Sequence, residues 1–220
     1  MEDKELQTEL ASIRSMMERS SRFISLSGLS GILAGVYALV GAAVAAFIIY
    51  SNKPQISPDI TANTPVNGLF YGRNYTFSLH GYDVLLMLIA AAVLTASVVT
   101  GIYLSIRKAK QKGQSVWNNS SRLLVYNAGI PLFTGGLMVI ILLSQYHFNL
   151  VTPAMLIFYG LALVSASNFT FSDVKYLGLM DIALGLISAC LPGYGLLFWS
   201  LGFGVLHIIY GSMMYLKYDR

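Results

Sequence analysis

The stretch 82–112, YDVLLMLIAAAVLTASVVTGIYLSIRKAKQK, decides the fold class of this chain. Its first part, 82–106, contains no lysine or arginine. A helix of that length, rising about 1.5 Å per residue, can cross a hydrocarbon layer about 30 Å thick. Its last part, RKAKQK, is strongly basic, which is typical of a chain that leaves the membrane on the cytoplasmic side. The stretch therefore predicts a transmembrane helix followed by a cytoplasmic loop.

Five more stretches are long and mostly apolar. They are 23–50, 123–146, 150–171, 174–191 and 196–215. Across the whole chain 55% of the residues are hydrophobic and 11% are charged, whereas about a quarter of the residues of a soluble domain are charged. The apolar residues run continuously, which excludes the alternating strands of a transmembrane β-barrel. The sequence predicts an all-α, polytopic membrane helix bundle with six transmembrane helices.

The basic residues predict the orientation of this bundle. The loop 107–122 contains no acid and carries Arg107, Lys108, Lys110, Lys112 and Arg122. Such a loop is expected in the cytoplasm, so the loop 51–81 faces outward and both termini are cytoplasmic. We therefore expect a multi-pass protein of the inner (plasma) membrane. Basic residues beside a bilayer set topology or contact anionic lipid, so lipid is an expected partner and nucleic acid is not.

Residues 1–22 form a predicted domain of their own, ahead of the transmembrane domain 23–220. Leu6, Leu10, Ile13 and Met17 repeat at the spacing of one helix face, which predicts an amphipathic cytoplasmic helix. We expect this helix to lie on the inner leaflet or under its own bundle, and the alternative is a short coiled seam between subunits.

The outer loop 51–81 is irregular in its proline-containing first half. Its second half, 69–82, alternates aromatic and polar residues. This pattern is expected of an aromatic belt at the level of the lipid headgroups, and the alternative is a lid or a partner site.

Small residues at helical spacing predict close helix packing. The first two spans carry such ridges at Ala34, Ala38, Ala42 and Ala46, at Ser27, Gly31 and Gly35, at Ala92, Ala96 and Thr100, and at Ser97, Gly101 and Ser105. Small side chains let helix backbones approach closely where lipid provides no hydrophobic drive for association. The ridges predict a tight bundle, a homo-oligomer, or both.

Asp181 and His207 are the leading candidates for a functional site. Asp181 is the one acidic residue well inside a predicted span, where a charge is costly and usually faces the protein interior. Each lies on a face of small residues: Gly178, Gly185 and Ser188 beside Asp181, and Ser200, Gly204 and Gly211 beside His207. Their positions along the helices allow the two side chains to meet in the inner half of the membrane. A carboxylate beside an imidazole suits a proton relay, and it equally suits a structural hydrogen bond between two helices.

Four other polar residues are candidates for the same pocket. Tyr126 and Asn127 lie on the third span, Asn168 on the fourth, and Tyr210 one turn from His207. Together they would give a polar pocket that opens toward the cytoplasm. Each of them alone is more typical of a hydrogen bond between helices, so only their convergence in space would make a site.

Sequence motifs of enzyme chemistry are absent. The chain has no HExxH, GxSxG, CxxC or phosphate-binding glycine loop, and its three histidines are scattered. Cys190 is the only cysteine, so an intramolecular disulfide is excluded. We therefore predict no catalytic residue, no metal and no cofactor.

The last third of the chain resembles a group of uncharacterised bacterial six-span inner-membrane proteins. The residues that carry the resemblance are 177–181 (LGLMD), 192–195 (PGYG) and 202–211 (GFGVLHIIYG). The resemblance implies a bacterial inner membrane, and it implies no particular activity.

The function predicted from these features is that of an integral membrane protein that transports or conducts a small solute or ion in a proton-linked manner. The polar pocket around Asp181 and His207 would be its site. The alternative is a non-catalytic membrane scaffold or sensor that acts through homo-oligomerisation and through a cytoplasmic or outer-face protein partner. In that alternative the polar pair only holds helices together.

Overall fold

The computed structural model describes residues 27–51, 81–111, 113, 116–145 and 147–219. The predicted leader helix, 1–22, and nearly all of the outer loop, 51–81, lie outside these described residues. Their predicted structures and the alternatives for them therefore stay predictions.

Nearly all of the described residues lie in helices and none lies in a strand, so the predicted all-α fold class is confirmed for them. The helices in chain order are α2 (Gly28–Ser51), α3 (Gly81–Gln111), α4 (Asn119–Ser144), α5 (Phe148–Ala166), α6 (Val174–Cys190), α7 (Gly195–Trp199), the π-helical segment η1 (Ser200–Leu206), α8 (His207–Met214) and a second π-helical segment, η2 (Tyr215–Asp219). The last four follow one another directly and form one C-terminal helical run.

Five helical stretches of the described chain are long and apolar enough to cross a membrane. They are Gly28–Ser51, Leu85–Gln111, Asn119–Ser144, Phe148–Ala166 and Gly195–Tyr218. The remaining predicted span corresponds to α6, whose 17 residues give a length of about 26 Å, close to the lower limit for crossing a bilayer. The count of six spans therefore stays a prediction.

The loop predicted at 107–122 is much shorter in the structure. Helix α3 continues to Gln111, so Arg107, Lys108 and Lys110 lie in its last turns, where the helix dipole favours cations. Helix α4 begins at Asn119, so Arg122 also lies on a helix. Hydropathy locates the edge of the apolar layer, and a helix can continue beyond that edge into the polar region.

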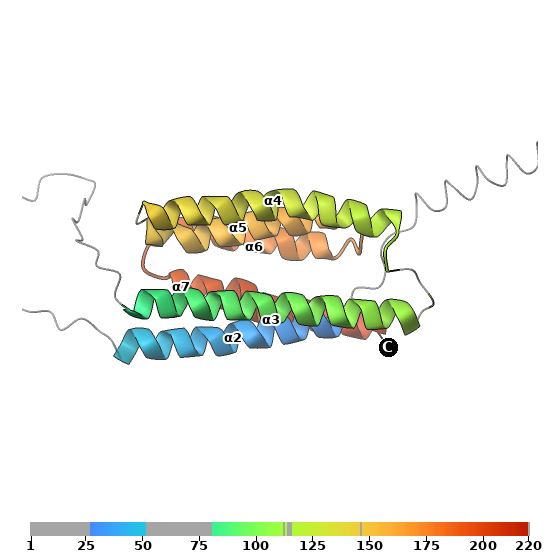
Figure 1. The fold of residues 1–220 in the computed structure, drawn as a ribbon, viewed down its shortest axis with the longest axis horizontal. Helices are drawn as coiled ribbons and strands as arrows, with labels where there is room; N and C mark the ends of the chain where they lie inside the picture. Colours follow the sequence, from blue (N-terminus) through green and yellow to red (C-terminus); the bar gives the residue numbers. More distant parts are fainter. Residues whose placement is uncertain (1–26, 52–80, 112, 114–115, 146, 220) are drawn as a thin grey trace, which may run out of the picture.

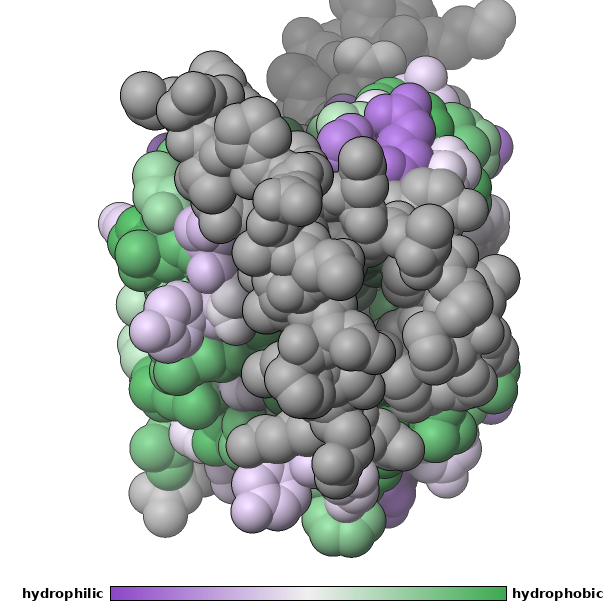
Figure 2. All heavy atoms as spheres, turned by 90° about the vertical axis from the view of Figure 1, so that its left-hand side faces the viewer, coloured by the Kyte–Doolittle hydropathy of each residue, from purple (hydrophilic) through white to green (hydrophobic). Residues whose placement is uncertain are grey.

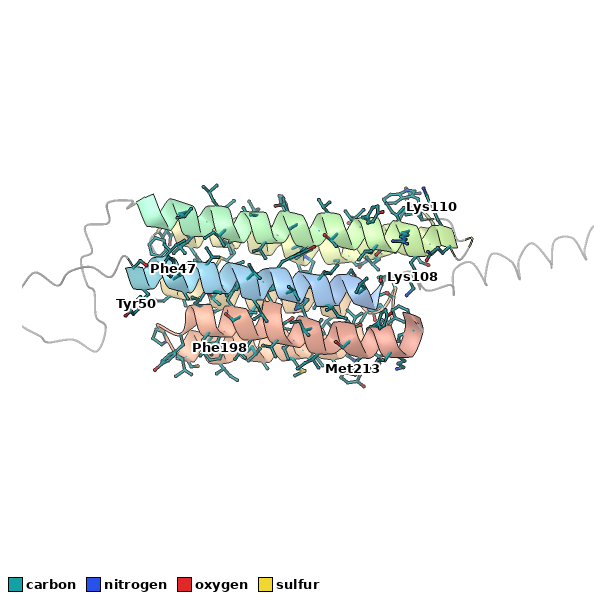
Figure 3. The ribbon with its side chains drawn as sticks, turned by 90° about the horizontal axis from the view of Figure 1, so that it is seen from below. Phe47, Tyr50, Lys108, Lys110, Phe198 and Met213 are labelled. Carbon is teal, nitrogen blue, oxygen red and sulfur yellow. The ribbon has the colours of Figure 1, made fainter. Side chains whose placement is uncertain are left out.

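The helices form two layers (Figure 1). One layer contains α4, α5 and α6, with α5 packed against both neighbours. The other contains α2, α3 and the C-terminal run, and Figure 3 shows α2 between α3 and that run. The layers contact each other where α5 and α6 meet α7 and η1. Lys108 and Lys110 lie at one end of the bundle, here called the basic end, and Phe47 and Tyr50 lie at the other (Figure 3).

Glycines bring the helices of each layer close together. A Cβ added to Gly160 on α5 would lie 2.5 Å from the Gly178 carbonyl oxygen on α6. In the other layer, a Cβ on Gly35 of α2 would lie 2.6 Å from the Gly204 carbonyl oxygen. The small-residue faces predicted around Gly35 and Gly178 therefore pack within this chain. By contrast Gly101, on the predicted ridge of the second span, has open space at the same position.

The outer surface of the described bundle is apolar. Large hydrophobic side chains such as Val40 (59% exposed), Leu94 (66%) and Phe133 (70%) face away from the core. Figure 2, which looks at the end opposite the basic one, shows hydrophobic residues on both flanks. Such a surface is favourable in hydrocarbon and unfavourable in water, as expected for an integral membrane protein.

Candidate functional site: a buried polar cluster beside a cavity between the helix layers

His207, at the start of α8, is held by hydrogen bonds on both of its ring nitrogens. Its Nδ1 lies 2.9 Å from the Gly202 carbonyl oxygen, and its Nε2 lies 2.7 Å from the hydroxyl oxygen of Tyr159 on α5. A carbonyl oxygen can only accept, so Nδ1 carries a proton and donates it to Gly202. In the neutral imidazole Nε2 is then an acceptor, and the Tyr159 hydroxyl donates to it. The bond to Tyr159 ties the two helix layers together inside the membrane.

Gly202 lies in the π-helical segment η1, which ends directly before His207. The bond to Gly202 spans five residues and is made by the imidazole side chain, while the His207 backbone N–H bonds to the Gly204 carbonyl oxygen. Gly202 also has to be a glycine, because an added Cβ would overlap the fully buried Leu156 and lie 3.0 Å from Asp181 Oδ1. Such π-helical turns occur frequently at functional sites.

Asp181, on α6, is completely buried close to Gly202. Neither carboxyl oxygen has a hydrogen-bond partner among the described residues. Asp181 and His207 thus approach the same glycine without bonding to each other, while the Asp181 carboxyl lies close enough to Tyr159 for an electrostatic interaction. An ionised carboxylate without a partner is very costly in such a place, so a proton or a cation has to neutralise it.

The other predicted site residues do not join this cluster. Tyr126 on α4 is 69% exposed, and the Asn127 amide donates to the Leu123 carbonyl oxygen of its own helix at 2.8 Å. The amide of Asn168 is exposed and donates to the Ser165 carbonyl oxygen at 3.3 Å. In both asparagines the side chain is satisfied by backbone one turn earlier, so neither has to face the interior.

Tyr210 lies in a different place from the predicted pocket. Its hydroxyl is buried without a partner among the described residues, and its ring packs against Phe171, Val174 and Met214. It lines a cavity of about 330 Å³ near the basic end, which neither Tyr159 nor His207 lines. The predicted single polar pocket is therefore not formed. Its two central residues, Asp181 and His207, are brought together around Gly202.

Two larger cavities lie between the helix layers. The first, of about 390 Å³, reaches the polar cluster at Tyr159 and His207, and it is also lined by residues of α2 and α3. The second, of about 530 Å³, lies toward the end opposite the basic one and is lined by α2, α3, α4, α5 and α7. Both are lined by Ala90, Met155 and Trp199, so they adjoin at these three residues. Together their linings extend from the part of the bundle near that end to the polar cluster.

Sequence reasoning missed Tyr159, Gly202 and the cavities. The available signal for Tyr159 was a tyrosine in the middle of an apolar helix, since a buried tyrosine hydroxyl usually has a hydrogen-bond partner. Gly202 belongs to the same stretch as Gly204, which was assigned to the small-residue face of His207. Nothing in the spacing indicated that a π-helical turn would bring Gly202 between the acid and the imidazole.

A separate ionic contact lies at the basic end. Lys217 Nζ is 2.8 Å from Asp173 Oδ2, and the Tyr218 hydroxyl donates to the same oxygen at 3.0 Å. The hydrogen bond from Lys217, and after it the one from Tyr218, holds the pKa of Asp173 below its usual value despite some desolvation. This contact joins the start of α6 to the end of the C-terminal run.

No protein-family model, no curated protein and no solved structure matches this chain. Within the part of the chain that the structure describes, no group of three or more His, Cys, Asp and Glu side chains is arranged to hold a metal ion.

Proposed function

We propose that this protein is a bacterial inner-membrane transporter that moves a small solute across the bilayer in step with protons. The cavity pair between the helix layers is the solute site. Tyr159, His207 and Asp181 form the proton site. The observation that carries the proposal is a fully buried, unpartnered carboxyl one glycine away from an imidazole that lines a cavity.

The protonation of Asp181 couples naturally to the cavity. An ionised Asp181 would need a compensating group, and the Tyr159 phenol, which interacts electrostatically with it, is bonded to the His207 imidazole at the cavity wall. Loss of its proton would therefore favour movement of His207 or of η1, and either movement changes the shape of the cavity. A solute that binds one of the two shapes better shifts the protonation equilibrium, and the reverse also holds.

Few other ionisable groups face this cluster. Tyr159 comes from α5 and Asp181 from α6, and Tyr210 lies one turn along from His207. The α2 and α3 residues that line the first cavity, among them Ser30, Ala34 and Ser97, carry no charge. A pH dependence in this region of the protein therefore reports on Asp181 and His207.

We place the basic end in the cytoplasm together with both termini, following the positive-inside bias of Arg107, Lys108, Lys110, Lys112 and Arg122. In this orientation the second cavity lies on the outer side, and the polar cluster lies between it and the cytoplasm.

The test uses liposomes that contain the full chain and a pH-sensitive dye, with a panel of small solutes added outside. We expect at least one solute to start a proton flux that Asp181→Asn abolishes. Asp173→Asn, which removes the carboxyl at the basic end, is the matched control and should keep the flux. A folded Asp181→Asn protein, verified by circular dichroism and gel filtration, with an unchanged flux would refute the proton role.

The scaffold alternative has one observation in its favour. Gly101 on α3 and Gly129 and Gly136 on α4 have open space where a Cβ would stand, although small residues commonly serve helix contacts in membranes. These faces suit contacts with a second copy or with another membrane protein. Failure of Asp181→Asn to assemble at all would favour this alternative.

A further inference from the structure

We infer that the two adjoining cavities bind one uncharged, flat, mainly apolar molecule with a hydrogen-bonding group at one end, such as an aromatic alcohol. This inference rests on the proposed function, because it names the class of solute for the same site. It follows from four properties of the cavity walls.

The first property is the absence of charge. No Asp, Glu, Lys or Arg is among the described residues that line either cavity. An ion entering this space would lose its hydration without gaining a counter-charge, which is very unfavourable in a medium of low dielectric constant. The cavities therefore select against ionised molecules.

The second property is the shape of the walls of the first cavity. On one side Trp199, Phe203, His207 and Tyr159 form a continuous aromatic surface, with ring centroids 5.6 Å apart for Trp199 and Phe203 and 5.1 Å apart for Tyr159 and Phe203. The rest of the lining consists mostly of small residues from α2 and α3. They include Gly31, Ala34, Ala38, Ala90 and Ala91. Aromatic rings next to small side chains leave room for a planar molecule that stacks on the rings.

The third property is the set of hydrogen-bonding groups on that aromatic surface. The Tyr159 hydroxyl donates a hydrogen bond to His207, so the Tyr159 hydroxyl oxygen can still accept a hydrogen bond from a ligand. Trp199 also lines both cavities, and its indole N–H has no hydrogen-bond partner among the described residues. A hydroxyl group on the ligand can donate to Tyr159 or accept from Trp199, which fixes its orientation.

The fourth property is size. The cavities measure about 390 and 530 Å³, and pockets for drug-sized ligands occupy about 300–1,000 Å³. The shared wall at Ala90, Met155 and Trp199 lets one elongated molecule extend from the polar cluster into the second cavity.

Trp199 gives a direct assay, because the chain has only two tryptophans and the other, Trp117, is exposed near the basic end. The Trp117→Phe protein in lipid nanodiscs has Trp199 as its only indole. Bromine quenches tryptophan fluorescence on contact, so 4-bromophenol at neutral pH serves as the probe. Bromobenzene and 4-bromobenzenesulfonate are matched probes without the hydroxyl and with a charge.

We expect 4-bromophenol to quench Trp199 in a saturable manner and the sulfonate not to do so. Bromobenzene should bind more weakly by about two- to tenfold, the worth of one hydrogen bond. In the same background Ala90→Phe, which fills the shared wall, should abolish saturable quenching. Ala92→Phe, a neighbouring exposed position outside the cavity lining, should leave it intact.

Three results would overturn the inference. In the first, quenching rises linearly with the concentration of every probe. In the second, quenching is equal in the Ala90→Phe and Ala92→Phe proteins. In the third, a phosphatidylcholine with brominated chains quenches Trp199 in a saturable manner and 4-bromophenol fails to displace it. The last result would mean that lipid occupies the cavity. The assay involves no proton gradient and no flux, so failure of binding here is distinct from failure of proton coupling in the Asp181→Asn experiment.

Discussion

Replacing Gly160 by alanine tests whether the contact between α5 and α6 determines the packing of the bundle. The added Cβ would lie 2.5 Å from the Gly178 carbonyl oxygen and 2.7 Å from an Ile182 side-chain carbon. Ordinary contacts of a Cβ begin at 3.4 Å. The two helices therefore have to separate by about 0.9 Å, or the strain has to remain, and overpacking of this kind costs about 1–3 kcal/mol.

Gly136→Ala on α4 is the matched control. This glycine is also within a helix, and a Cβ there meets nothing within 4 Å. Both replacements gain the same helix propensity, about 1 kcal/mol in water, so this gain cancels when the variants are compared. The difference between them is then the packing cost alone, about 1–3 kcal/mol.

The measurement is reversible unfolding of the two purified variants in mixed micelles with increasing sodium dodecyl sulfate, followed by circular dichroism. We expect Gly160→Ala to unfold at a lower detergent fraction than Gly136→Ala, with the wild type between them or close to Gly136→Ala. Equal midpoints for the two alanine variants would refute the close approach of α5 and α6.

Three further outcomes follow from contacts in the structure. Tyr159→Phe removes the donor to the buried imidazole, so the unfolding free energy in the same micelle titration should fall by about 0.5–1.5 kcal/mol; an unchanged value contradicts the bond. Asp173→Asn should lower the thermal midpoint above about pH 4. The ion pair with Lys217 lowers the pKa of Asp173 in the folded state, so the wild type loses the stabilisation from this pair as the pH falls through the lowered pKa. The thermal midpoints of the wild type and of Asp173→Asn should then converge. A difference between them that persists at low pH argues against the ion pair. Asn118→Ala removes the hydrogen bond that the Asn118 side chain accepts from the Ser121 amide at the cap that begins α4. This change should cost about 0.5–2 kcal/mol with faster amide exchange in the first turn, while the exposed neighbour Asn119→Ala should not.

The fold class could be predicted from the sequence because hydropathy reports directly on the solvent around each segment. Five of the predicted spans correspond to helices that are long and apolar enough to cross a membrane. Helix ends were predicted less well, as the extension of α3 to Gln111 shows, since a helix continues wherever its backbone bonds are satisfied. The π-helical register of η1 could not be predicted, because hydropathy is the same for either hydrogen-bonding pattern.

The site was only partly predictable. The spacing of small residues around Asp181 and His207 identified the buried faces of two helices, because such residues permit close approach. Asn127 and Asn168 do not join Asp181 and His207, because the amide of each donates to a carbonyl oxygen of the previous turn of its own helix. Which tyrosine of an apolar helix faces the interior depends on the packing of α5 against η1, and no local pattern encodes that packing.

The absence of a bond to Asp181 among the described residues separates the two roles considered for it. A structural role requires the carboxyl to hold two helices together through a hydrogen bond, and in the structure that bond is made by His207 and Tyr159 instead. A buried acid without a partner lowers stability, so its replacement by the isosteric amide should leave assembly intact. A cost of this kind is typical of residues kept for function rather than for folding. Stable assembly of Asp181→Asn together with loss of proton flux would therefore mean that this carboxyl is retained for its proton.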